Sequence, residues 1–432
     1  MISKEYMERV LAIAADTKFF EMYPGAIYEV AEVFKKAFPA KRALVVADAI
    51  TWSICGKEMT CHIQESRLPS EYHLISDDHF KAELKYVEEI EEALEEPETI
   101  AIAVGSGAIN DLCKLASYRA GKQYLCFPTA ASVDGYTAFN ASIFVNGVKT
   151  TFECPAPRVV VADTAIIASA PKSTTAAGYA DLAAKIISGA EWILGDFVGR
   201  EPINSDAWHA LQDVLDISLC RPKKVAEGDH NALDDMFKAL CLSGMSMQLV
   251  HSSRPASGTE HLFSHYLDMI EHSFNGRRFS HGFQVGVGTL IMCRLFEKFL
   301  AADFTTIDVD ALVAKWPTLE QEQAEADRLF ADFVKPDLGR QIAAEKYYTK
   351  DEVRQILTKI KAKWPDLQAR LRGQVYTYKH IHRLLRRVGA PSKAADLGLN
   401  RRDVRKILSR LRLMRNRVSL LDIAKMLDFK LY

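Results

Sequence analysis

Short apolar runs alternate with amphipathic stretches over the first part of the chain. Five of these runs have the length and composition of buried strands: residues 43–47, 72–76, 99–105, 123–127 and 158–162. Three of them are followed by stretches with helical periodicity, at residues 51–59, 80–94 and 109–120. This alternation predicts βαβ units that build a parallel sheet.

The pattern changes further along the chain. Residues 141–152 alternate polar and apolar positions around Asn146-Gly147, which predicts a β-hairpin. Beyond Pro171 the strand patterns fade, and apolar residues recur at three- and four-residue spacing in 177–194, 205–219, 235–251, 259–273, 283–299, 319–333 and 350–371. We therefore expect an α/β domain over residues 1–168 and an all-α domain over residues 169–432.

Composition narrows the class of protein. The chain has 55 Lys+Arg against 56 Asp+Glu, and this balance argues against generic nucleic-acid binding. Its eight cysteines form no CxxC pair, which predicts buried, reduced thiols. The N-terminus lacks the apolar core of a signal peptide, and no apolar stretch is long enough to span a membrane. We expect a soluble, cytoplasmic protein.

One segment departs from this neutrality. Between Arg370 and Arg417 there are fifteen Lys and Arg residues against two acids, Asp396 and Asp403. The simplest interpretation is a set of solvated helix faces whose arginines pair with acids elsewhere in the fold. An anionic-substrate mouth, an oligomer contact and a helix-turn-helix-like nucleic-acid surface are the alternatives.

The sequence Gly105-Ser106-Gly107 stands where a predicted strand gives way to a helix. Glycines at such a turn let the backbone approach a phosphate, and the helix N-terminus offers N–H donors to it. Asn110 occupies the place of the third glycine of the GxGxxG pattern, so this turn alone is weak evidence for a nucleotide. Asp48 ends an earlier strand and has two possible roles, a contact to an adenosine ribose or a helix N-cap.

Histidines gather in the helical half. His261 and His265 are four residues apart, so both lie on one face of a predicted helix, and His281 opens the next helix. Asp181 projects from an otherwise small and apolar helical stretch. A carboxylate with two or three imidazoles suits a divalent transition metal. Spacing favours His261 with His265 and does not choose between His265 and His281.

Five ordered motifs resemble those of the sn-glycerol-1-phosphate dehydrogenases, a family of the iron-containing alcohol dehydrogenase and dehydroquinate synthase-like superfamily. The motifs are Gly105-Ser-Gly-Ala-Ile-Asn-Asp111, Pro128-Thr-Ala-Ala-Ser-Val-Asp-Gly-Tyr136, Ala177-Gly-Tyr-Ala-Asp181, Ser253-Arg-Pro-Ala-Ser-Gly-Thr-Glu-His-Leu-Phe-Ser-His265 and His281-Gly-Phe-Gln-Val-Gly286. The resemblance implies a dehydroquinate synthase-like fold, with a Rossmann-like domain that binds NAD or NADP and a helical domain that binds one divalent metal (Zn, Ni or Fe).

The resemblance also assigns residues. It implies Asp181, His261 and His281 as metal ligands, with His265 as a neighbour that either supports a ligand or faces the substrate. Cofactor contacts are expected from Asp48, Gly105, Ser106, Gly107, Asp111, Thr129 and Ser132. Asp134 is expected to contact the substrate, and Lys149 and Arg254 are candidate phosphate donors that could equally be structural ion-pair residues.

The implied reaction interconverts dihydroxyacetone phosphate and sn-glycerol 1-phosphate by hydride transfer. The alternatives are a dehydrogenase for glycerol, another polyol or a polyol phosphate, a dehydroquinate synthase-like cyclase, and a non-catalytic relative that binds nucleic acid. For partners we expect a small phosphorylated three-carbon substrate and a second copy of the chain in a dimer or larger oligomer, and no nucleic acid.

Overall fold

A computed structural model describes residues 1–77 and 80–432 of the chain. The described residues form two compact units, and neither is continuous in sequence. The first comprises Met1–Leu182, Asp206–Ser253 and Arg387–Gly389, and the second comprises Ala183–Ser205, Arg254–Arg386 and Ala390–Tyr432. The division into domains at residue 168 stays a prediction.

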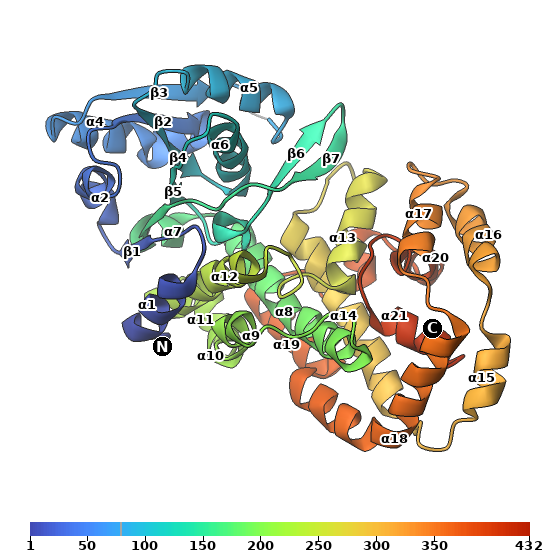
Figure 1. Ribbon diagram of the computed structural model, residues 1–432. Helices are drawn as coiled ribbons and strands as arrows, with labels where there is room; N and C mark the ends of the chain where they lie inside the picture. The colour runs from blue at the N-terminus through green and yellow to red at the C-terminus, as the bar shows by residue number, and fades with distance from the viewer. Residues whose placement is uncertain (78–79) are drawn as a thin grey trace. The chain divides into compact units, whose positions relative to one another are not determined.

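A six-stranded parallel sheet is the centre of the first unit, which confirms the predicted fold class (Figure 1). The strands lie in the order β1, β8, β5, β4, β2, β3 and comprise Phe19–Tyr23, Val159–Asp163, Leu125–Pro128, Thr99–Gly105, Arg42–Asp48 and Ser70–Ile75. Every residue of β4 is buried, as expected for a central strand that is covered on both faces. The edge strand β1 was not predicted, because four of its five residues are only half-buried, Glu21 is exposed, and its polar and apolar positions do not alternate.

Helices α2 (Val30–Ala37) and α4 (Lys57–Glu65) bury apolar side chains against one face of this sheet. Phe34 and Met59, both fully buried, belong to that core. Helix α6 (Gly107–Arg119) packs against β4 and against α5 (Leu84–Ala93). The predicted hairpin is present as β6 (Ala141–Val145) and β7 (Val148–Phe152), with Asn146 and Gly147 both at positive φ, as the turn requires.

The remaining helices of the first unit are short except one. The longest of them is α12 (His230–Val250). The others are α1 (Lys4–Ile13), α3 (Ala49–Thr51), α7 (Thr164–Ser169), α9 (Ser205–Gln212), α10 (Leu215–Leu219) and α11 (Pro222–Glu227). The helix predicted over 205–219 is thus divided into α9 and α10. Helix α8 (Lys172–Val198) carries Asp181, and its residues 175–195 are all buried.

The second unit is helical, in line with the predicted all-α half. It contains α13 to α21, which comprise Thr259–Met269, His281–Leu300, Val309–Lys315, Leu319–Phe330, Leu338–Glu345, Lys350–Gln374, Tyr378–Val388, Arg401–Leu411 and Leu420–Met426. Helices α13 and α14 pack against each other, and α20 packs against α13. Within the described residues, no helix combines the length and the apolar character that a membrane span requires.

Candidate functional site

The turn between β4 and α6 has the geometry expected of a phosphate loop. Gly105 ends β4, Ser106 is the N-cap residue, and Gly107 begins α6. A side chain at Gly105 would place its Cβ 2.7 Å from Cβ of Ile109, so glycine there permits the helix to pack closely on the strand. The N–H groups of the first helical turn lack intrahelical acceptors and can bind an anion.

Asn110, at the position of the third glycine of the pattern, and Lys114 of α6 both bind the loop that follows β5. The Asn110 amide donates to the carbonyls of Gly135 and Tyr136, at 3.2 and 3.4 Å, and accepts from the Tyr124 hydroxyl at 3.1 Å. The buried Lys114 ammonium donates to the carbonyls of Gly135, Ala138 and Asn140 at 2.8–2.9 Å. The third position of the pattern therefore anchors the loop that follows β5.

That loop carries three of the predicted site residues. Thr129 is buried and donates its N–H to the carbonyl of Gly105 at 3.1 Å. The Ser132 hydroxyl lies 3.1 Å from the Tyr136 hydroxyl. Asp134 accepts from the Ser243 hydroxyl at 2.8 Å, and its backbone N–H donates to the Asp181 carboxylate at 3.1 Å. The loop thus brings Asp134 beside the proposed metal ligand of α8.

Two predicted cofactor residues have structural partners. Asp48 accepts from the N–H groups of Ile50 and Thr51, both at 2.8 Å, and is the N-cap residue of α3, one of the two roles expected for it. Asp111 accepts from the N–H of Ser142 at 3.1 Å. Burial raises the pKa of the Asp111 carboxyl, and the ammonium groups of Lys114 and Lys149 oppose that rise. Contacts of either residue to a cofactor stay predictions.

Asp181, His261 and His281 form a group that could hold a metal ion. One ligand atom from each residue lies within 4.8 Å of the others. Asp181 and His261 are buried, and His281 is half-buried as the first residue of α14. His265 is close by: its ring centroid lies 6.0 Å from that of His281, against 5.3 Å between His261 and His281.

Hydrogen bonds orient both imidazoles for metal binding. The Nδ1 of His261 lies 2.8 Å from the Glu260 carboxylate, which can only accept, so Nδ1 carries the proton. The Ser264 hydroxyl donates to the Gln284 amide oxygen at 2.6 Å, so Ser264 accepts from Nδ1 of His281 at 2.9 Å. Both assignments place the lone pair on Nε2, the arrangement typical of metal-binding histidines. The donor set therefore fits a divalent transition metal.

The two candidate phosphate donors differ in their surroundings. The Arg254 side chain is buried, and its Nε lies 2.7 Å from the Glu201 carboxylate while its Nη2 donates to the carbonyls of Glu191 and Val418. These are the contacts of a structural ion-pair residue, the alternative that the sequence left open for Arg254. Lys149 lies on the hairpin strand β7, opposite Phe144.

Sequence reasoning missed the partners that support the histidines. Glu260, Ser264 and Gln284 were not predicted, although Glu260 is adjacent to His261 in sequence. The signal that could have found Glu260 is its position next to His261, a candidate metal ligand. Ser264 and Gln284 gave none, because their pairing depends on the packing of α13 against α14.

Known proteins similar to this chain agree with the architecture. Residues 21–171 match the family described as iron-containing alcohol dehydrogenase. Among solved structures, a probable glycerol dehydrogenase from Sinorhizobium meliloti aligns with a TM-score of 0.63 at 17% identity over 96% of both chains. Sulfoacetaldehyde reductase from Bifidobacterium kashiwanohense, solved in complex with NAD+, aligns with a TM-score of 0.60 at 15% identity over 96% of both chains. These likenesses show the fold.

Sequence relatives are more specific. Glycerol-1-phosphate dehydrogenase [NAD(P)+] from Pyrococcus furiosus is 38% identical over 63% of this chain and 76% of its own length. The protein of the same name from Halalkalibacterium halodurans is 31% identical over 59% of this chain, and the match spans 64% of the relative's length. The chain belongs to the glycerol-1-phosphate dehydrogenase family, among the iron-containing alcohol dehydrogenases.

Proposed function

We propose that the chain is a metal-dependent, NAD(P)-linked dehydrogenase that interconverts dihydroxyacetone phosphate and sn-glycerol 1-phosphate. The observation that carries this proposal is the grouping of Asp181, His261 and His281, with their ligand atoms within 4.8 Å, in a chain of this family. The names of the relatives support the substrate pair and the nicotinamide cofactor.

In this proposal Asp181, His261 and His281 hold one divalent ion, of zinc, nickel or iron. Such an ion supplies Lewis-acid polarisation of the reacting oxygen of an alcohol or ketone. Glu260 and Ser264 fix the orientation of the two imidazoles, and they keep Nδ1 protonated, so the Nε2 lone pair of each ring would bind the ion. Asp134 is held between Ser243 and Asp181, and this placement suits a carboxylate that accepts from a substrate hydroxyl.

The cofactor's pyrophosphate is assigned to the Gly105–Gly107 turn, where the first N–H groups of α6 are available to an anion. Thr129 and Ser132 lie on the adjoining loop and are proposed for the nicotinamide side. Asp48 and Asp111 complete the proposed set. Of the two candidate donors for the substrate phosphate, Lys149 is favoured, because the Arg254 guanidinium is committed to Glu201 and to two carbonyls.

The proposal also includes His265 as a substrate-facing residue, a cytoplasmic location, and a homo-oligomer. Its experimental test is the identity of the product. Purified protein is incubated with dihydroxyacetone phosphate and NADH or NADPH, and the configuration of the resulting glycerol phosphate is determined at the central carbon. sn-Glycerol 1-phosphate supports the assignment. Its absence, with rapid reduction of unphosphorylated dihydroxyacetone, would favour the polyol dehydrogenase alternative.

A further inference from the structure

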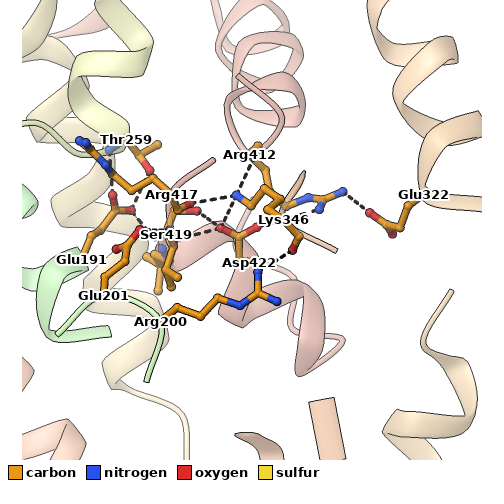
Figure 2. A network of polar contacts seen from close by, with 12 residues as sticks. Glu191, Arg200, Glu201, Thr259, Glu322, Lys346, Arg412, Arg417, Ser419 and Asp422 are labelled. Atoms are coloured by element: carbon orange, nitrogen blue, oxygen red, sulfur yellow. Dashed lines mark hydrogen bonds and ion pairs between the residues drawn. The ribbon is translucent and has the colours of Figure 1, made fainter. Parts of the chain in front are cut away.

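Glu191 is a buried residue of α8, and its carboxylate accepts hydrogen bonds at the N-termini of two other helices. Its Oε2 accepts from the backbone N–H of Thr259 at 2.8 Å, and its Oε1 accepts from the Thr259 hydroxyl at 2.7 Å and from the N–H of Leu420 at 3.0 Å. Thr259 is the first residue of α13, and Leu420 is the first residue of α21. Figure 2 shows Glu191 beside Thr259 and Ser419. One side chain therefore satisfies N-terminal donors of both helices.

The helix held in this way is the one that carries His261. The residue between Thr259 and His261 is Glu260, whose Oε1 accepts from the N–H of Gly258 at 2.7 Å and contacts Nδ1 of His261 at 2.8 Å. A Cβ at Gly258 would lie 2.7 Å from Oε2 of Glu260 and 2.8 Å from Oε2 of Glu191, so the two carboxylates flank this glycine. A displacement of Glu191 would thus change the position of the His261 imidazole.

The C-terminal segment that precedes α21 reaches the same region. Arg415 and Arg417 donate to the Ser257 hydroxyl and the Ser257 carbonyl, and Arg410 donates to the Tyr266 hydroxyl of α13 at 2.7 Å. The N–H of Val418 donates to Glu201 at 3.0 Å. These arginines belong to the basic segment 370–417, and their side chains contact the loop before α13 and α13 itself.

Holding Glu191 in this place is energetically costly. Burial and the neighbouring Glu260 carboxylate raise the pKa of Glu191 to about 7, while the Thr259 and Leu420 donors oppose that rise. If the Glu191 side chain only filled space, an apolar or amide side chain of the same size could replace it with little loss of stability.

We propose that Glu191 is a positioning residue for the metal site, because it fixes the start of the His261-bearing helix α13 and ties the C-terminal helix α21 to it. This inference rests on the metal site of the proposed function. Replacing Glu191 by Gln makes a sharp test, because both carboxylate oxygens accept in the parent. Either orientation of the amide turns an NH2 group toward a donor.

The experiment uses the metal-free full-length protein with Co²⁺ as the probe, at pH 8, and needs no turnover. The dissociation constant comes from chelator competition, and the visible absorption bands report the coordination geometry. Glu322→Gln is the matched control: Glu322 is also a buried carboxylate of the second unit, and its partners are Arg412 and Lys425, outside α13. His281→Ala reports the loss of the site itself.

We expect Glu191→Gln to weaken Co²⁺ binding by about tenfold or more and to shift the absorption bands, whereas Glu322→Gln stays within about twofold of the parent. Unchanged affinity and spectrum in Glu191→Gln, or an equal loss in Glu322→Gln, would overturn the positioning role. If Glu191→Gln fails to fold, Thr259→Val removes one donor to the same carboxylate and should weaken binding by severalfold; parental binding in it would also overturn the role. A parent protein without Co²⁺ binding would instead refute the proposed metal site.

Discussion

His265 and His281 are the two candidates for the second histidine ligand, and their ring centroids lie 6.0 Å apart. His281 is oriented by the Ser264 hydroxyl and grouped with Asp181 and His261. We therefore expect His281→Ala to abolish both bound metal and turnover, and His265→Ala to retain the metal and lose mainly turnover. Metal analysis of the purified variants tests this. A fully occupied His281→Ala protein would make His265 the ligand.

Gly258 is a residue whose small size the site requires. A methyl group there would lie within 3 Å of the Glu191 and Glu260 carboxylates, both buried. We expect Gly258→Ala to lower the free energy of unfolding by about 1–3 kcal/mol. Gly373→Ala is the control, because Gly373 lies in α18 with no atom near its Cβ position, and alanine there should stabilise the helix by about 0.5–1 kcal/mol. Denaturant unfolding distinguishes the two; equal effects would refute the steric account.

For single residues, the sequence predicted which types of side chain gather at the candidate site better than it chose between two residues of the same type. Spacing alone paired His261 with His265, and the family resemblance was needed to prefer His281, since the contact between α13 and α14 is not encoded locally. Arg254 had two open roles because sequence does not show whether a guanidinium is buried beside Glu201. Glu191 gave no signal, because its partners are 68 and 229 residues away.

Among the elements, α6 depends on a residue that departs from the nucleotide-binding pattern. Restoring the third glycine by Asn110→Gly removes bonds to Gly135, Tyr136 and Tyr124. We expect this change to lower the free energy of unfolding by about 2–4 kcal/mol. Tyr118→Gly, at an exposed position of the same helix, should cost about 1 kcal/mol or less. If Asn110→Gly is no worse than Tyr118→Gly in urea denaturation, the loop is anchored by other contacts.

The start of α6 should determine cofactor affinity. The nearest atom to a Cβ at Gly107 is Cγ2 of Val133 at 3.0 Å, so a larger side chain there crowds the turn. We expect Gly107→Val to weaken NADH binding by about tenfold or more, because the backbone can no longer approach the pyrophosphate. A fluorescence titration with NADH measures this, with Co²⁺ binding as the control for an intact metal site. NADH affinity equal to that of the parent would contradict the assignment of this turn.

Elements with a strong pattern were predicted closely. The strand expected over 99–105 coincides with β4, and the Asn-Gly turn connects β6 to β7. Elements with a weak pattern were missed, such as β1 at the sheet edge and the helices α19 and α20, whose many arginines obscure the apolar periodicity. In α20 those apolar positions, Ile407, Leu408 and Leu411, are buried.

For the whole molecule, the basic segment 370–417 is the main departure from an even charge distribution. Several of its arginines pair with acids of the second unit, as in Arg412 with Glu322, Arg410 with Asp332 and Arg370 with Asp196. These pairs agree with the simplest interpretation of the segment, ion pairing with acids elsewhere in the fold. Figure 2 shows Arg412 and Lys346 within such a network.

The central claim concerns the substrate, and the ratio of kcat/KM for dihydroxyacetone phosphate to that for dihydroxyacetone tests it most directly. A phosphate that binds away from the reacting carbon helps align the ketone with the nicotinamide, so its removal lowers transition-state binding. We predict a ratio of about 100 or more, measured by the oxidation of NADH with the metal-loaded protein. Comparable values for the two ketones would contradict the phosphate assignment and favour a polyol dehydrogenase.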